Sequence, residues 1–165
     1  MWGYRWNGTA TGEQMLYAIM GIDPRLYAEV SGSTEFGTAL FGIGYDLNND
    51  NSFTLSPDLS FNSQHFAAGG YDTVDDSRVA TSAGDLWQEG WYSAGYWSYW
   101  LSTESRLAAD FSDWDYSGVG MSSRELSNGD WDGWSFDYDF VWPSPLPPPN
   151  RRRFFRFQNQ ALGQC

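Results

Sequence analysis

The chain has 165 residues and a formal net charge of −12, and 19 % of its residues are Phe, Trp or Tyr. This much ring surface can bury a core, which excludes global disorder, and no apolar run is long enough to predict a membrane span. The single cysteine, Cys165, excludes an internal disulfide framework or a cysteine-based zinc site. The single histidine, His65, excludes a multi-histidine metal site, and the absence of lysine excludes a Schiff base or a P-loop.

The acidic charge is concentrated before residue 150, where five arginines stand against all 21 acidic residues, a net charge of −16. Such a surface repels phosphate backbones, so we expect no nucleic-acid partner. The acid-rich, lysine-free and aromatic-rich composition favours an extracellular or cell-surface protein that meets cations or sugars. The alternative is that the charge only keeps an aromatic surface soluble. No signal peptide is visible, and we expect an upstream export segment to be missing from this chain.

The first half of the chain predicts a strand, then a helix, then more strands. Rings alternate over Trp2–Trp6, which predicts a strand close to the first residue. Thr11 and Gln14 form a capping-box pattern before a helix of about nine residues that ends at Gly21. Apolar residues then alternate over Leu26–Val30, and a second strand is predicted within Phe36–Tyr45.

The second half predicts short strands separated by Gly, Ser, Asn and Asp turns. One strand is expected within Phe53–Phe61, and Ser63–Ala83 is expected to be a long surface loop. Further strands are expected over Trp91–Leu101, Tyr116–Met121 and Trp131–Tyr138.

These elements predict one α+β domain, mostly β, over residues 1–142, with one N-terminal helix on a twisted sheet. A proline-rich segment then begins at residue 143 and leads to an arginine- and phenylalanine-containing end. Because proline is excluded from sheet interiors and the end has no periodic apolar face, residues 143–165 are expected to be a linker and a disordered basic tail.

An aspartate- and asparagine-rich loop is the clearest candidate metal site. Its oxygen-bearing residues are Asp46, Asn48, Asp50 and Ser52, at positions 1, 3, 5 and 7 of the loop. This spacing lets a tight loop surround Ca²⁺ with hard oxygen ligands. Pro57 stands at position 12, where a bidentate acid is expected, so calcium binding would be weak. The alternative is an Asx-rich turn that binds nothing.

Aromatic residues at alternate positions are the strongest feature of the chain. One face of Trp91–Leu101 must build the core, while Tyr92, Tyr96 and Trp100 fall on the other face. Together with Trp131, these rings are the candidate ligand-binding residues, because exposed rings bind sugars, flat macrocycles or partner proteins. The alternative is that both faces of the strand are buried.

The last predicted strand carries both rings and acids. Its period of two places Trp134 and Phe136 on a buried face and Trp131 on a more exposed one. Paired carboxylates such as Asp130 and Asp132 are compatible with a glycan hydrolase, although alternate acids more often form the wet face of a strand. We therefore expect a binding module without catalytic residues. The alternatives are a glycan-active hydrolase and a structural matrix protein without a small ligand.

Three motifs carry a resemblance: Gly90–Trp100, Tyr116–Ser122 and Leu126–Phe136. They resemble secreted bacterial surface proteins of the PEP-CTERM-associated type. Their order is also similar to the C-terminal domain of transcobalamin-like proteins. The resemblance implies a β-grasp-like α+β domain that binds a small ligand, a glycan or a surface protein outside the membrane. The corrinoid site of the cobalamin-type domains is completed by a second domain, so we do not expect corrinoid binding by this domain alone.

Overall fold

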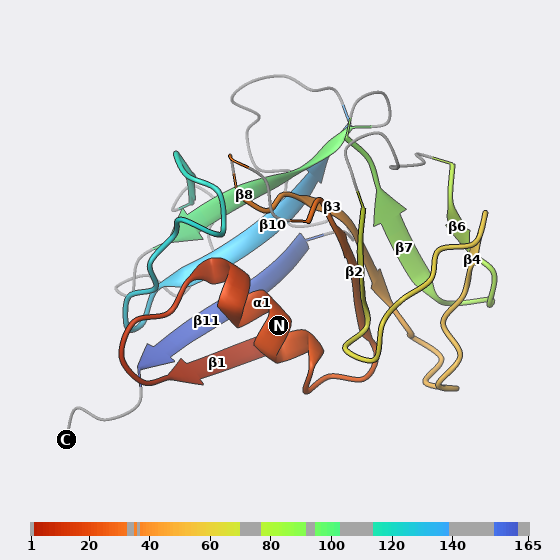
Figure 1. Ribbon diagram of the computed structural model, residues 1–165, viewed down its shortest axis with the longest axis horizontal. Coiled ribbons are helices and arrows are strands. Elements are labelled where there is room, and N and C mark those ends of the chain that lie inside the picture. Colours follow the sequence, from red (N-terminus) through yellow and green to blue (C-terminus); the bar gives the residue numbers. More distant parts are fainter. Residues whose placement is uncertain are drawn as a thin grey trace.

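The computed structural model describes residues 2–32, 35, 37–69, 77–91, 95–102, 114–138 and 154–161, the last of these as backbone only. These residues form one α-helix and three β-sheets (Figure 1). The predicted class, α+β and mostly β, is confirmed. Among the described residues, no helix has the length and apolar character needed to cross a membrane.

The largest sheet has five strands in the order β1-β11-β10-β8-β9. Their bounds are Trp2–Trp6 (β1), Phe154–Ala161 (β11), Trp131–Asp137 (β10), Tyr96–Ser102 (β8) and Asp115–Tyr116 (β9). β1 and β11 run parallel, and the other neighbours are antiparallel. The longest described pairing joins β8 to β10, so these two strands form the centre of the aromatic region.

The second sheet has four strands in the order β5-β2-β3-β7. Their bounds are Phe66–Ala68 (β5), Leu26–Val30 (β2), Leu40–Tyr45 (β3) and Leu86–Glu89 (β7). Two short strands, β4 (Leu55–Ser56) and β6 (Val79–Ala80), pair separately outside it.

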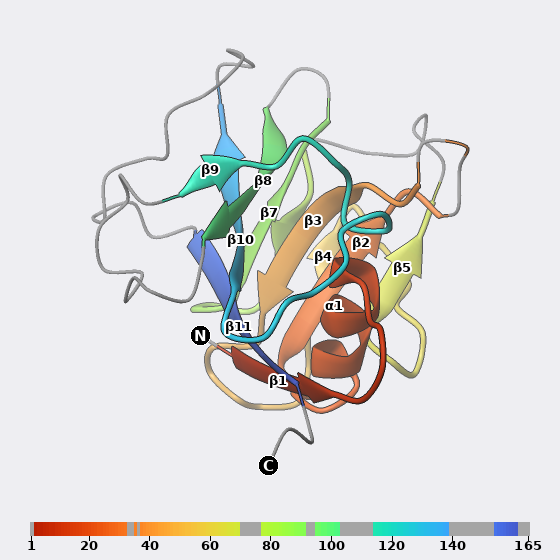
Figure 2. The same ribbon diagram turned by 90° about the vertical axis from the view of Figure 1, so that its left-hand side faces the viewer.

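The helix α1 spans Gly12–Met20 and confirms the predicted cap. The Thr11 hydroxyl accepts a hydrogen bond from the Gln14 amide at 3.3 Å, and the Gln14 side chain accepts one from the Thr11 amide at 3.0 Å. These bonds satisfy two donors that would otherwise lack partners in the first turn. Figures 1 and 2 show α1 close to β1 and β2, where its apolar face helps to close the main core.

The main core lies between the two large sheets and α1. Its buried members are Met15, Leu16, Ile19, Met20, Leu26, Ala28, Val30, Leu40, Ile43, Trp97, Tyr99, Met121, Trp134 and Phe136. A second cluster of Tyr27, Phe53, Leu55 and Trp87 covers the other face of the four-stranded sheet. A third cluster joins Trp100, Trp114 and Trp131 on the other face of the five-stranded sheet. Both sheets therefore bury apolar side chains on both faces.

The expectation that residues 143–165 stay outside the fold is wrong for Phe154–Ala161. This segment is β11, which pairs with β1 on one side and with β10 on the other. A strand inside a sheet is held by backbone hydrogen bonds to both neighbours, and these do not require an apolar periodicity. The proline-rich segment and the remaining tail residues lie outside the described residues.

Three predicted boundaries also differ. The expected loop Ser63–Ala83 contains β5 and β6, and β9 covers only the start of Tyr116–Met121. The strand predicted from Trp91 begins at Tyr96 instead. Gly95 has a φ of +118°, and a side chain there would collide with the backbone of Asp137, so extended pairing starts only after it.

Candidate functional site

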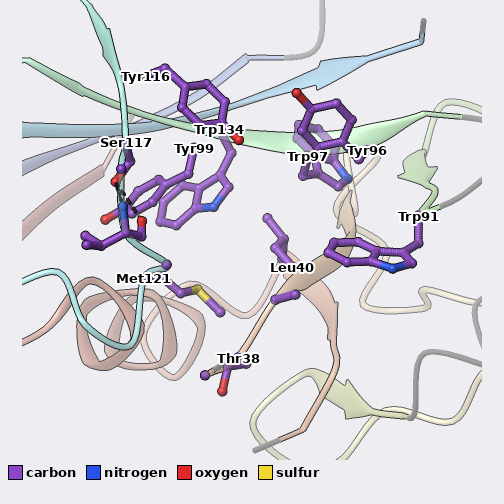
Figure 3. Close-up of a pocket in the computed structure, with 15 residues that line it drawn as sticks. Thr38, Leu40, Trp91, Tyr96, Trp97, Tyr99, Tyr116, Ser117, Met121 and Trp134 are labelled. Carbon is purple, nitrogen blue, oxygen red and sulfur yellow. Dashed lines mark hydrogen bonds between the residues drawn. The ribbon is translucent and has the colours of Figure 1, made fainter. Parts of the chain in front are cut away.

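An aromatic cavity of about 620 Å³ opens beside the first half of β8 (Figure 3). Six rings of the described residues line it: Trp91, Tyr96, Trp97, Tyr99, Tyr116 and Trp134. The other lining residues are small or apolar: Gly37, Thr38, Ala39, Leu40, Ser117, Gly118, Val119, Gly120 and Met121. Its volume lies within the range of small-molecule sites, roughly 300–1,000 Å³.

The rings of the cavity are positioned by strand register. Tyr99 of β8 lies opposite Trp134 of β10, and their rings stack with centroids 4.6 Å apart and planes at 17°. Trp97 pairs in the same way with Phe136, edge to face at 5.3 Å. Trp91 precedes β8 and packs edge to face on Phe41 of β3. The cavity therefore contains rings supported by both sheets.

Several polar atoms of the lining already form hydrogen bonds with other groups of the protein. The Tyr99 hydroxyl donates to the Asp132 carboxylate at 2.5 Å, and the Trp97 indole N–H donates to the Gln88 carbonyl at 3.1 Å. The Ser117 hydroxyl donates to the Val119 carbonyl at 2.7 Å. Burial raises the pKa of the Tyr99 phenol, and Asp132 adds to the shift, so this hydroxyl stays protonated and donates.

The opposite wall is tied to α1 by hydrogen bonds. The Thr38 amide donates to the Ser122 hydroxyl at 2.8 Å, and the Thr38 hydroxyl donates to Glu13 at 2.5 Å. The Gly12 and Glu13 amides at the start of α1 donate to the carbonyls of Arg124 and Met121, each at 3.0 Å. Figure 2 shows the segment after β9 passing beside α1. The start of α1 thus holds in place the two loop segments that line the cavity, one at Thr38 and one at Met121.

Two further phenols meet at the cavity. Burial raises the pKa of Tyr116, and the neighbouring Tyr96 phenol adds to the shift. The pKa of Tyr96 is raised by burial first and then by the negative charge of Asp137. Both groups are therefore neutral at pH 7 and bring no charge to the cavity.

The predicted exposed ring platform is wrong where the structure describes it. Tyr96, Trp100 and Trp131 are only 8 %, 6 % and 7 % exposed, and Tyr92 lies outside the described residues. Trp100 and Trp131 pack with Trp114 on the second face of the sheet, so that face is covered rather than open. Ligand binding by these four residues stays a prediction, and among the three described ones Tyr96 lines the cavity.

The register predicted for the last strand is confirmed in part. Trp134 and Phe136 are buried in the main core, while Trp131 lies in the separate cluster on the opposite face. The predicted alternation of faces is therefore right. The predicted exposure of Trp131 is wrong, because Trp100 and Trp114 cover it.

The two carboxylates considered for a hydrolase both contact one arginine. Arg124 lies 2.7 Å from Asp130 and 3.5 Å from Asp132, measured from its terminal nitrogen to a carboxylate oxygen. Asp132 is fully buried and also accepts the Tyr99 hydroxyl. The geometry gives the group a structural role, in which the Arg124 guanidinium balances the charge of the buried Asp132 carboxylate.

The predicted metal loop is built from Asx turns. The buried Asp46 carboxylate accepts hydrogen bonds from the amides of Asn49 at 2.6 Å and Asn51 at 3.0 Å. The side chains of Asn48 and Asp50 each accept the amide two residues further on, which for Asp50 belongs to the predicted ligand Ser52. No group of three His, Cys, Asp or Glu in the described part of the chain is arranged to hold a metal.

Asp85 is a neighbour of this loop that sequence reasoning missed. Its carboxylate accepts the Leu47 amide at 3.1 Å. Burial raises the pKa of Asp85, and the negative charges of Asp46 and Asp50 act in the same direction, while backbone hydrogen bonds oppose the shift. No spacing in the sequence predicts that Asp85 lies beside the loop, because the pairing of β7 with β3 brings Asp85 there. Calcium binding at the loop stays a prediction.

A second buried ionic cluster was also invisible in the sequence. Arg78 lies 3.2 Å from Glu29 of β2 and 3.2 Å from Glu89 of β7. Gly42 of β3 stands between the two glutamates in register and leaves room for them on one face. The Trp87 indole N–H donates to Glu89 at 2.6 Å. This cluster stabilises the outer face of the four-stranded sheet and lies apart from the cavity lining.

Comparison with known proteins does not add a family or a neighbour. The chain has no significant match among protein-family models, among curated proteins or among solved structures.

Proposed function

We propose that this domain is a ligand-binding module whose site is the aromatic cavity beside β8. The observation that carries the proposal is the combination of about 620 Å³ of space with six lining rings. A concave, mainly apolar cavity with a few polar groups is the usual form of a small-molecule site. The site differs from the exposed platform expected from the sequence, although Tyr96 belongs to both.

The residues that line the cavity favour ligand binding over catalysis. The phenols that line the cavity have raised pKa values and are neutral at pH 7. In the described part of the chain, the lining residues include no acid, histidine or cysteine. A hydroxyl nucleophile or an attacking water needs such a group within reach as the base that activates it. We therefore propose a module that holds its ligand without transforming it.

We further propose that the module works outside the cell or at the cell surface. The net charge of −12 and the absence of lysine support this location, as does the resemblance to secreted bacterial surface proteins. Fractionation of cells that produce the natural protein would test it. Recovery in the cytoplasm alone would contradict the proposed location without affecting the proposed site.

The binding site is tested by calorimetric titration with two unlike probes, naphthalene carboxamide and cellobiose. We expect saturable binding of at least one probe to the wild type. Trp91→Ala removes a lining ring and should weaken this binding about tenfold or more. Tyr138→Ala is the matched control, because Tyr138 is half-exposed and lies outside the cavity lining.

Circular dichroism and a thermal melt establish that both variants are folded. Absence of binding by both probes would contradict the proposed site. Equal binding by wild type and Trp91→Ala would contradict it as well, because the ligand would then occupy another surface.

A further inference from the structure

We infer, resting on the proposed function above, that the cavity selects an uncharged ligand with a flat, mainly apolar ring system. A glycan or a charged small molecule does not fit this lining. The inference follows from the side chains that form the wall, from the hydrogen bonds that already occupy their polar atoms, and from the placement of the rings.

The cavity-lining residues that the structure describes carry no charged side chain. Charged groups behind the wall act on its side chains: Glu13 accepts the Thr38 hydroxyl, Asp132 accepts the Tyr99 hydroxyl, and the negative charge of Asp137 raises the pKa of Tyr96. Asp132 also faces Arg124. Since none of the described lining side chains can form an ion pair with the ligand, a charged ligand would leave water without a contact counter-charge, which is unfavourable in an apolar site.

The hydrogen-bonding capacity of the wall is largely used within the protein. Trp97 donates to a carbonyl and Ser117 donates to a carbonyl, while Tyr99 donates to a carboxylate. The Tyr96 and Tyr116 phenols interact with each other. A sugar ring brings many hydroxyl groups that each need a partner once water is excluded. The wall offers too few, so a sugar would lose more hydrogen bonds than it gains.

The remaining interaction is contact with ring faces and apolar side chains. Figure 3 shows the Tyr99 and Trp134 rings at one end of the cavity and the Trp91 ring at the other, with Leu40 and Met121 near them. Flat apolar rings gain most from such a wall through burial and offset stacking. The stacked Tyr99–Trp134 pair leaves less open ring face for a cation than a cage of separate rings would.

The test compares three probes that share a naphthalene ring and differ in net charge. Naphthalene carboxamide is neutral, naphthalene carboxylate is an anion and naphthylmethylammonium is a cation, while cellobiose represents a glycan. Calorimetric titration of the wild type should show tightest binding of the carboxamide. We expect each charged probe to bind at least about tenfold more weakly, and cellobiose to show no saturable binding.

A rim variant provides a second test that does not depend on a buried ring. Val119 lines the cavity but is 48 % exposed, so Val119→Arg adds a cation at the rim without burying it. We expect Val119→Arg to bind naphthalene carboxylate about threefold more tightly than the wild type does. An unchanged affinity for the carboxylate would contradict charge selection at this cavity.

The outcomes separate this inference from the proposed function. Tightest binding of cellobiose or of a charged probe, lost in Trp91→Ala, would overturn the ligand class while keeping the site. Binding that Trp91→Ala leaves unchanged would overturn the site itself. Preference for the carboxamide, lost in Trp91→Ala and kept in Tyr138→Ala, would support both.

Discussion

The two large sheets bury aromatic rings in different ways. In the five-stranded sheet, β8 and β10 place ring opposite ring, as Tyr99 and Trp134 do with centroids 4.6 Å apart. In the four-stranded sheet, Trp87 of β7 lies opposite Gly44 and covers the glycines of β3. A Cβ added to Gly42 would stand 2.5 Å from the Trp87 ring. The five-stranded sheet packs large side chains against each other. The four-stranded sheet packs a large ring against glycines, which have no side chain.

This difference shows what each sheet is sensitive to. Ring-on-ring packing requires that the register of neighbouring strands is kept over their length, because a slip of one residue moves every ring to the other face. Ring-on-glycine packing requires only that two positions stay without side chains. The stability of the five-stranded sheet should therefore depend mainly on strand pairing. The stability of the four-stranded sheet should be sensitive to single substitutions of its glycines by residues with a side chain.

Truncation after Trp142 should have the largest effect. It removes β11, which pairs with both β1 and β10. Each lost backbone hydrogen bond contributes about 1 kcal/mol, so we expect a loss of at least about 3 kcal/mol in the free energy of unfolding. This loss corresponds to a fall of roughly 6–12 °C in Tm. Truncation after Ala161 is the control, and an unchanged Tm in the shorter chain would show that β11 does not stabilise the sheet.

Gly42→Ala tests the four-stranded sheet. The added Cβ would stand 2.5 Å from the Trp87 ring and 3.2 Å from the Glu89 Cβ, so the buried ring must shift. Such overpacking costs about 1–3 kcal/mol, measurable as a lower urea midpoint. Gly3→Ala in β1 is the matched control, because a Cβ there meets no atom of the described side chains or backbone within 4 Å. Its effect should stay within about 0.5 kcal/mol, and equal losses in both variants would refute the packing argument.

Calcium should act on the loop that follows β3, at Asp46, Asn48, Asp50 and Ser52. Weak binding, with a Kd of about 10⁻⁴–10⁻³ M, is expected because the loop lacks a bidentate acid at its twelfth position. A tenfold excess over Kd should stabilise the fold by about 1.4 kcal/mol. Thermal melts in millimolar Ca²⁺ and in chelator measure the shift in wild type and in Asp50→Ala. If the two proteins respond alike, the loop is only a turn.

Alkaline pH should weaken the packing around α1 by a smaller amount. Burial raises the pKa of Tyr17 to about 12, and Glu13 adds to the shift. Because the folded pKa lies above the unfolded value of about 10, the stabilisation is complete below pH 10 and is lost as the pH rises towards 12. Urea midpoints between pH 9 and 12 should fall less steeply in Tyr17→Phe than in the wild type. Parallel slopes would mean that Tyr17 does not contribute.

Local patterns in the sequence determined several elements. The capping box at Thr11 and Gln14 predicted α1, because its two hydrogen bonds form within one turn and need no distant partner. The period of two in Trp131–Asp137 predicted that Trp134 and Phe136 share a buried face, because side chains alternate along any strand. The α+β class follows from one helix signal among many short strand signals.

Tertiary structure alone decided the rest, because it depends on which strands become neighbours. β11 is held by backbone pairing with β1 and β10. The side-chain pattern of Phe154–Ala161 does not predict this pairing. Trp131 is buried because Trp100 and Trp114 are brought over it from separate segments. The cavity likewise exists only where Trp91 is brought opposite the Tyr99–Trp134 pair. Alternation assigns a ring to a face, but only the packing of other segments decides whether that face is covered, open or hollow.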